Sequence, residues 1–305
     1  MVRGDGGGYF PCMTLPNFIV IGAAKAGTTA LYWYLSEHPA VFMSPVKETN
    51  FFGYGRDADG RLLYGDPEIH HFPIQTMAEY EQLFEGADGA AAVGEASPIY
   101  LECPEAAERI RSAIPSVRLI ASLRQPVERA YSDYLMHLRH RGLRFDPARD
   151  LTPSAPWATA DSRWMQVSRY HAQLERYYAA FPRSQIHVAL FDDLKRDALG
   201  MVQQVYRFVG VDADFAPDFD TPHAIGGLPS SRLLERVLTN RVVGSVVKPL
   251  LPMTAANWVR RMRARNLKKP PALPKQLQRE LTARLFREDI ERTARLIGRG
   301  LDHWL

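Results

Sequence analysis

The stretch "FIVIGAAKAGTT", Phe18 to Thr29, decides the fold of this chain. Its first four residues are apolar and lie between Pro16 and Gly22, a pattern that predicts a short buried strand. The residues that follow, "TTALYWYLSEH" at 28–38, have the spacing of a helix. A strand that enters a helix through a loop of glycine and other small residues is typical of phosphate-binding folds.

The lysine of this loop stands in an unusual place. Gly22 and Gly27 nearly keep the spacing of a Walker A loop, in which the lysine follows the second glycine and reaches the outer phosphates of a nucleoside triphosphate. Here Lys25 precedes Gly27, and Thr28 occupies the usual lysine position. A lysine set earlier suits a ligand with a single phosphate in the loop and a transferable group attached to it, because it can neutralise the bridging oxygen. On spacing alone, a glycine turn with a solvated lysine stays open as the alternative.

The rest of the loop favours an anion. Ala26 and Gly27 have small side chains or none, so that backbone N–H groups can approach a phosphate closely. Thr28 and Thr29 open the predicted helix, where their hydroxyls, the free amides and the helix dipole attract negative charge.

Alternating strands and helices continue along the chain. Apolar runs at 91–96, 117–123 and 185–190 are each followed by a helical pattern. This order predicts an α/β fold like that of the P-loop NTPases: three layers, with a central, mainly parallel sheet between helices and a helical C-terminal region. In such sheets ligands bind beyond the carboxyl ends of the strands.

We find no linker that divides the chain, so residues 1–305 are predicted to form a single domain with a flexible N-terminus at 1–15. Residues 141–163 are rich in Pro, Arg and Asp and are interpreted as a lid or acceptor-binding segment, with a disordered insertion as the alternative. Residues 231–305 are predicted to be helical, with a final helix at 275–297 that stops at Gly298.

The composition favours a globular enzyme in the cytoplasm. A formal net charge of +4 is consistent with anionic ligands and argues against a dedicated nucleic-acid binder. Cys12 and Cys103 match no metal-ligand spacing, and no apolar run is long enough for a signal peptide or a membrane span. The basic stretch 260–269 is predicted to be a solvated helix face or a peripheral contact with an anionic glycan or lipid headgroup.

Four motifs together resemble a known family. The segments "FIVIGAAKAGTTALYWYLSEHP", "PVKETNFF", "GEASPIYL" and "LRQPVERAYSDY" occur in the order found in sulfotransferases that use 3′-phosphoadenosine 5′-phosphosulfate. The chain is most similar to the branch that sulfates glycans, which includes the heparan sulfate sulfotransferases and many bacterial relatives. Its ending, "FREDIERTARLIGRGLDHWL", is similar to that of the family, so that the resemblance covers nearly the whole chain.

The resemblance implies a donor site without a metal. The loop would hold the 5′-phosphate, with Lys25 at the bridging oxygen and Ala26 to Thr29 around the phosphate. Arg124 and Ser132 would hold the 3′-phosphate, which also remains on the product, 3′-phosphoadenosine 5′-phosphate. Tyr170 is expected to line the nucleotide pocket. Arg232 is a substitute for a lysine-rich loop that the sequence lacks.

The acceptor side is implied less directly. Glu48 matches the glutamate that takes the acceptor's proton in the glycan branch, and Lys47 would orient it or meet the acceptor. His70 and His71 are alternative bases or acceptor contacts. Several glycan sulfotransferases carry a lysine where Ala96 stands here, so a second cation is either absent or supplied from elsewhere.

Other functions stay open at this stage. A magnesium-dependent nucleotide kinase or NTPase would use Asp192 or Asp193 as a metal ligand, but we interpret these aspartates as caps of the helix that follows. A non-catalytic nucleotide-binding protein is a third possibility. The acceptor, whether glycan, lipid or another natural product, and the oligomeric state do not follow from the sequence.

Overall fold

The computed structural model describes residues 15–53, 55, 72, 74–219, 228–229, 267–268 and 271–305. His70, His71, Arg232 and the segment 260–266 lie outside the described residues. The roles predicted for them stay predictions.

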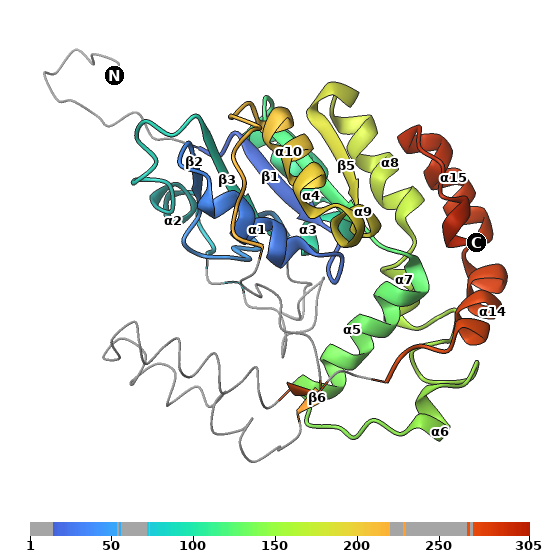
Figure 1. Cartoon of the computed structure of the whole chain (residues 1–305). Coiled ribbons are helices and arrows are strands. Elements are labelled where there is room, and N and C mark those ends of the chain that lie inside the picture. The colour runs from blue at the N-terminus through green and yellow to red at the C-terminus, as the bar shows by residue number, and fades with distance from the viewer. Residues whose placement is uncertain are drawn as a thin grey trace, which may run out of the picture.

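A five-stranded parallel sheet forms the centre of the molecule (Figure 1). Its strands are β1 (Phe18–Gly22), β2 (Val41–Met43), β3 (Ala92–Ala96), β4 (Arg118–Leu123) and β5 (Ile186–Leu190), in the order β2-β3-β1-β4-β5. In register, Ile19 of β1 pairs with Glu95 on one side and with Leu119 on the other. The predicted α/β class with a parallel sheet is confirmed. A separate antiparallel pair joins β6 (Leu228–Pro229) to β7 (Leu267–Lys268).

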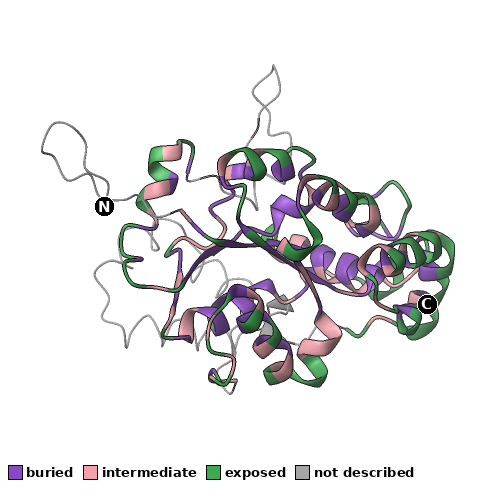
Figure 2. Ribbon diagram, turned by 90° about the horizontal axis from the view of Figure 1, so that it is seen from above, coloured by how far each residue is buried: buried purple, intermediate pink, exposed green. Residues whose placement is uncertain are grey.

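Helices cover both faces of this sheet, as the view from above shows (Figure 2). Alternate residues of β1 point to opposite faces: Ile19 and Ile21 join one buried cluster, and Phe18 and Val20 join the other. The helices around the sheet are α1 (Thr28–Glu37), α2 (Met77–Gln82), α3 (Ile99–Glu102), α4 (Ala106–Ala113), α5 (Pro126–His140), α8 (Tyr170–Ala180), α9 (Phe191–Arg196) and α10 (Ala198–Val209). The described part of the C-terminal region adds α14 (Lys275–Leu285) and α15 (Arg287–Ile297).

Residues 141–163 pack against α5 and include the short helix α6 (Pro147–Asp150). Trp157 is fully buried, and its indole N–H donates a hydrogen bond to the carbonyl of Asp150 at 2.8 Å. Tyr134 of α5 donates to the carboxylate of Asp150 at 2.8 Å. The segment is therefore packed into the main core beside α5, and its role as a lid or acceptor-binding segment stays a prediction.

Two predicted helix features are wrong. The expected helix at 275–297 is two helices, because Phe286 leaves the helical conformation and turns its fully buried ring into the core. Gly298 does end the second helix, with a φ of 70°. Asp192 and Asp193 lie inside α9 and do not cap α10, whose N-terminus is capped by Asp197 through the N–H of Gly200 at 2.9 Å.

Candidate functional site

A cavity of about 500 Å³ opens at the carboxyl ends of the strands. Its wall includes a residue from the segment that follows each strand of the central sheet. These are Lys25 after β1, Glu48 after β2, Glu102 at the end of α3 after β3, Arg124 after β4 and Phe191 after β5. This is the edge where open parallel sheets bind ligands. The structure therefore brings together, from distant parts of the sequence, most of the residues that the motifs single out.

The loop after β1 is held in place by hydrogen bonds to the neighbouring strand β4. Ser122 of β4 accepts a hydrogen bond from the N–H of Ala23 at 2.8 Å and donates its hydroxyl to the carbonyl of Ala26 at 2.6 Å. Ala26 is fully buried and its own N–H is used within the loop, so that it shapes the loop while Gly27, Thr28 and Thr29 line the cavity.

Gly27 could not carry a side chain here. Its φ is 88°, and an added Cβ would lie 2.8 Å from Leu194 Cδ2 and 2.9 Å from Phe191 Cδ2. The glycine therefore allows the loop to turn tightly into α1 against α9, with Thr28 and Thr29 at the start of the helix.

Lys25 brings a poorly solvated positive charge to the cavity. Its ammonium group lies 3.4 Å from the sulfur of Met136, which is a weak acceptor. Burial, helped by the positive charges of Arg139 and Arg124, lowers the pKa of Lys25 from 10.5 to about 8, although Asp133 acts in the opposite direction. An anion placed beside Lys25 would restore the stability of the charged form.

Arg124 joins the end of β4 to the loop after β1. One guanidinium nitrogen donates to the carbonyl of Lys25 at 3.3 Å, and two others contact Glu128 at 3.2 and 3.1 Å. The guanidinium carbon also lies 4.8 Å from the centre of the Phe191 ring. Ser132 of α5 lines the same cavity. The two residues predicted to hold a 3′-phosphate thus meet Lys25 in one site.

Tyr170 and Lys47 do not line this cavity. Tyr170 is 1% exposed, and its hydroxyl donates to the carbonyl of Arg124 at 2.8 Å. It supports Arg124 from behind, which corrects the expectation that it faces the nucleotide. Lys47 forms an ion pair with Glu48, consistent with the predicted orienting role.

The loop after β2 brings Glu48 to the cavity in a strained conformation. Glu48 and Asn50, which both line the cavity, have φ values of 63° and 54°. The left-handed region is rare for residues other than glycine. The side chain of Glu48 is 45% exposed, while its N–H donates to the carbonyl of Ala96 at 3.0 Å. Ala96 itself is fully buried, and Arg139 and Arg163 are further cations in the wall.

Several wall residues were missed in the sequence. Met136, Arg139 and His140 follow Ser132 on α5 at steps of 4, 7 and 8 residues, so that helical spacing alone could have found them. Asp133 comes directly after Ser132, a step that places it on a different face of an ideal helix. The sequence near Arg163 gives no sign that this residue lines the cavity. Arg163 begins α7 (Arg163–Gln166) and forms an ion pair with Glu102 at 3.1 Å.

The described ranges, 15–53, 55, 72, 74–219, 228–229, 267–268 and 271–305, contain neither a metal cluster nor a membrane-spanning helix. Within these ranges no cluster of three or more His, Cys, Asp or Glu side chains could hold a metal ion. The same ranges contain no helix that is both long and apolar enough to cross a membrane.

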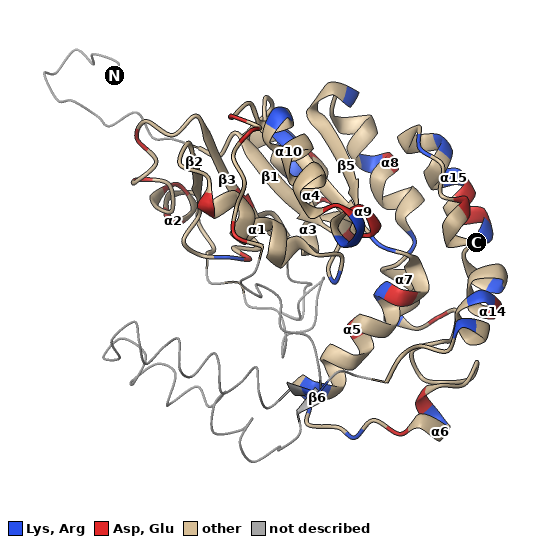
Figure 3. Cartoon of the chain, in the orientation of Figure 1, with Lys and Arg blue, Asp and Glu red and all other residues tan. Residues whose placement is uncertain are grey.

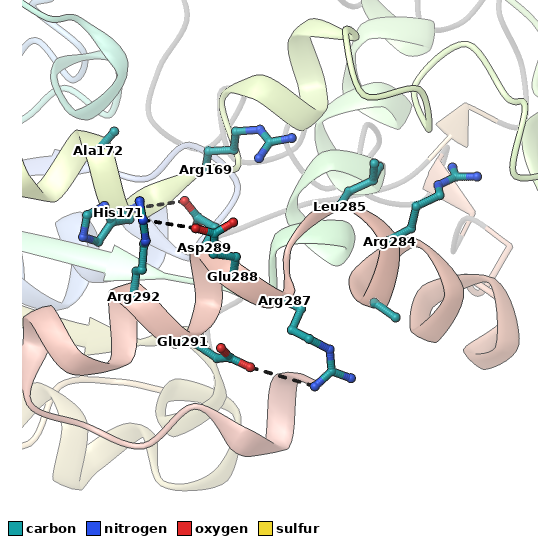
Figure 4. Close-up of a pocket in the computed structure, with 11 residues that line it drawn as sticks. Arg169, His171, Ala172, Arg284, Leu285, Arg287, Glu288, Asp289, Glu291 and Arg292 are labelled. Carbon is teal, nitrogen blue, oxygen red and sulfur yellow. Dashed lines mark hydrogen bonds and ion pairs between the residues drawn. The ribbon is translucent and has the colours of Figure 1, made fainter.

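A second cavity, of about 550 Å³, lies between the start of α8 and the helices α14 and α15 (Figure 4). Along α15 three acidic residues stand between Arg287 and the two arginines nearer its end, so that both signs of charge lie on this helix (Figure 3). Arg292 pairs with Glu288 at 3.1 Å, and Asp289 accepts the N–H groups of Tyr170 and His171 at 2.9 and 3.3 Å. Because these charges are matched within the protein, we assign the cavity to helix packing.

Comparisons with known proteins show the family of this chain. A model of the sulfotransferase family matches residues 16–215. Mouse bifunctional heparan sulfate N-deacetylase/N-sulfotransferase 4 is 32% identical over 213 residues, which are 66% of this chain and 23% of that protein. Human bifunctional heparan sulfate N-deacetylase/N-sulfotransferase 3 is 30% identical over 216 residues, with the same coverage. The match thus spans about a quarter of the length of these relatives.

A solved structure covers much more of the chain. The crystal structure of a sulfotransferase from Alicyclobacillus acidocaldarius superposes with a TM-score of 0.66 at 30% sequence identity. The superposition covers 95% of this chain and 99% of the other. With a family match over more than half of its residues and this likeness over nearly its full length, the chain belongs to the sulfotransferase family.

Proposed function

We propose that this protein transfers a sulfuryl group from 3′-phosphoadenosine 5′-phosphosulfate to a hydroxyl or amine group by in-line displacement. The observation that carries the proposal is the meeting of Lys25 and Arg124, whose guanidinium donates to the lysine's own carbonyl, in one cavity with Glu48. Two cations on adjacent loops suit a nucleotide with separate 5′- and 3′-phosphates. The cavity volume lies in the range of cofactor sites, roughly 300 to 1,000 Å³.

The residues divide between binding and chemistry. Lys25, with the amides and hydroxyls of Gly27 to Thr29, would hold the 5′-phosphate, and Arg124 with Ser132 would hold the 3′-phosphate. The donor supplies an activated sulfuryl group. Lys25 neutralises the charge that gathers on the bridging oxygen as the S–O bond breaks, which stabilises the transition state. Glu48 accepts the acceptor's proton as the new bond to sulfur forms.

We further propose a carbohydrate acceptor. Apart from the residues assigned to the donor and the base, the cavity wall includes the charged and polar groups of Arg139, His140, Arg163 and Glu102. Such a wall is suited to the many hydroxyls of a sugar and poorly suited to an acyl chain. The mammalian relatives are heparan sulfate N-deacetylase/N-sulfotransferases, which supports the same acceptor class.

The donor assignment is tested by calorimetric titration with 3′-phosphoadenosine 5′-phosphate, beside ADP with magnesium. We expect tight binding of the first and weak binding of the second. Preference for ADP with magnesium would replace the proposal with a kinase or NTPase. The variant Lys25→Ala should lose transfer of labelled sulfate, whereas Lys275→Ala, which removes an exposed lysine of α14, should leave it unchanged.

A further inference from the structure

A fully buried carboxylate lies beneath the loop that carries Glu48. Glu95, the penultimate residue of β3, is 0% exposed. One of its oxygens accepts the hydroxyls of Ser97 at 2.7 Å and Thr49 at 3.2 Å, and the other accepts the hydroxyl of Tyr80 at 3.3 Å. Within the described part of the chain, the hydrogen-bond partners of Glu95 are hydroxyls, not cations. A carboxylate held in this way is an acceptor that sets the direction of every hydroxyl around it.

Two chains of hydrogen bonds run from Glu95 to the backbone of the Glu48 loop. In the first, Ser97 gives its only O–H to Glu95, so that its oxygen is left to accept the N–H of Asn50 at 3.0 Å. The short chain therefore ends on a residue whose φ is 54°.

The second chain is one hydroxyl longer. Thr49 is fully buried and donates to Glu95, so the contact of 3.0 Å between Thr49 and Tyr100 requires Tyr100 to be the donor. The oxygen of Tyr100 then accepts the N–H of Phe52 at 3.4 Å. In this arrangement Glu95 is the acceptor at the common end of both chains.

The strained backbone needs such support. A residue other than glycine in the left-handed region costs about 1–3 kcal/mol and persists only where its surroundings determine it. Here the N–H of Glu48 donates to the carbonyl of Ala96. The next two residues are also held, Thr49 by its bond to Glu95 and Asn50 by its bond to Ser97. Burial raises the pKa of Glu95, while the hydrogen bonds from Ser97, Thr49 and Tyr80 act against that rise.

We propose that Glu95 is a positioning residue, which acts through Ser97, Thr49 and Tyr100 to hold the backbone of residues 48–52 so that Glu48 faces the reacting group. The catalytic consequence rests on the proposed function of Glu48, but the structural claim does not. It assigns a role to the glutamate of "GEASPIYL", which makes no contact with the cavity, and to the threonine of "PVKETNFF".

Hydrogen–deuterium exchange measured by mass spectrometry tests the structural claim. The variants are Thr49→Val, which removes the hydroxyl at nearly constant shape, Thr49→Ser, which restores it, and Glu95→Gln, which puts a donor beside the two hydroxyls. We expect the amides of 48–52 to exchange on the order of tenfold faster in Thr49→Val and Glu95→Gln, about the effect of losing one hydrogen bond. Thr49→Ser should match the wild type, and the loop at 23–29 should be unchanged in all three.

The catalytic claim is tested with the same proteins, with N-desulfated heparin as acceptor. Thr49→Val should lower kcat on the order of 10- to 100-fold, with KM for the donor and affinity for 3′-phosphoadenosine 5′-phosphate unchanged, and Thr49→Ser should restore kcat. Unchanged exchange at 48–52 in Thr49→Val and Glu95→Gln would overturn the inference alone. A wild-type protein that does not bind 3′-phosphoadenosine 5′-phosphate would overturn the proposed function alone.

Discussion

Lys25 connects the donor site to pH. Burial lowers its pKa to about 8, whereas a phosphate beside the ammonium raises it again. At a pH between the pKa of Lys25 in the free protein and its higher pKa in the complex, Lys25 is neutral when free and charged when the phosphate is bound. Binding at such a pH must therefore take up a proton. The affinity for 3′-phosphoadenosine 5′-phosphate should therefore fall above about pH 8, by up to about tenfold per pH unit.

Calorimetry in two buffers with different ionisation enthalpies measures this proton uptake directly. Lys25→Arg is the control, because arginine keeps its charge throughout the range and should bind without proton uptake. Equal wild-type affinities at neutral pH and at about pH 9 would contradict the prediction, since an ordinary lysine titrates near 10.4.

Substitution of Glu48, a second single residue, should affect the transfer step and leave donor binding unchanged. Glu48→Gln removes the proposed base but keeps the shape of the side chain, so that kcat should fall on the order of 10²- to 10⁴-fold with donor affinity unchanged. Transfer of labelled sulfate measures kcat, and Glu85→Gln, an exposed glutamate outside the cavity, is the matched control. A kcat equal to that of the wild type would move the role of base to another group, such as His70 or His71.

At the scale of elements, α15 caps α8. Asp289 accepts the two first N–H groups of α8, and Tyr170 at the start of that helix supports Arg124. Asp289→Ala should lower the free energy of unfolding by about 1 kcal/mol and weaken donor binding. Urea denaturation measures the first effect. Glu288→Ala, which breaks an exposed pair with Arg292, should change stability by less, and equal effects of the two variants would refute the capping role.

The turn into α1 gives a second prediction at this scale. Gly27→Ala adds both backbone strain and close contacts with Leu194 and Phe191, so donor binding should be lost and stability should fall by at least about 1–3 kcal/mol. Gly89→Ala is the matched control, because Gly89 has a similar φ of 83° but nothing within 4 Å of the added Cβ. If the two variants are equally stable and both bind donor, the contacts with α9 do not matter.

At the scale of the whole molecule, residues near the C-terminus form hydrogen bonds with the segments that follow β4 and β5. Gln125, next to Arg124, donates to Thr282 at 2.7 Å and to the carbonyl of Trp304 at 3.3 Å. Trp304 is 3% exposed and donates its indole N–H to Asp192 at 2.7 Å. Trp304→Ala should lower the free energy of unfolding by about 3–5 kcal/mol.

Thermal and urea unfolding measure this loss, and Trp304→Phe separates its two causes. Phenylalanine retains most of the buried surface but has no N–H for Asp192, so its cost should be the smaller one. A Trp304→Ala protein as stable as the wild type would show that the segment does not support the fold.

Local patterns made much of this molecule predictable. The strand before Lys25, the helix after it and the position of Arg124 follow from short periodic runs, which do not depend on distant residues. The break at Phe286 and the place of Tyr170 depend on what the rest of the chain packs against them, and the pairing of Arg163 with Glu102 joins segments 61 residues apart. The sequence contains no local sign of such contacts.

The strand order has a consequence for redesign. Strands β2 and β3, which carry Glu48 and the hydrogen bonds beneath it, form one side of the sheet, whereas β1 and β4 carry Lys25 and Arg124. Libraries that diversify Arg139, His140, Arg163 and Glu102, keeping Thr49, Glu95 and Ser97, can therefore be screened for new acceptors with Lys25, Arg124 and Glu48 left in place. The proposed base and the proposed donor contacts can therefore be varied separately, because they follow different strands of one sheet.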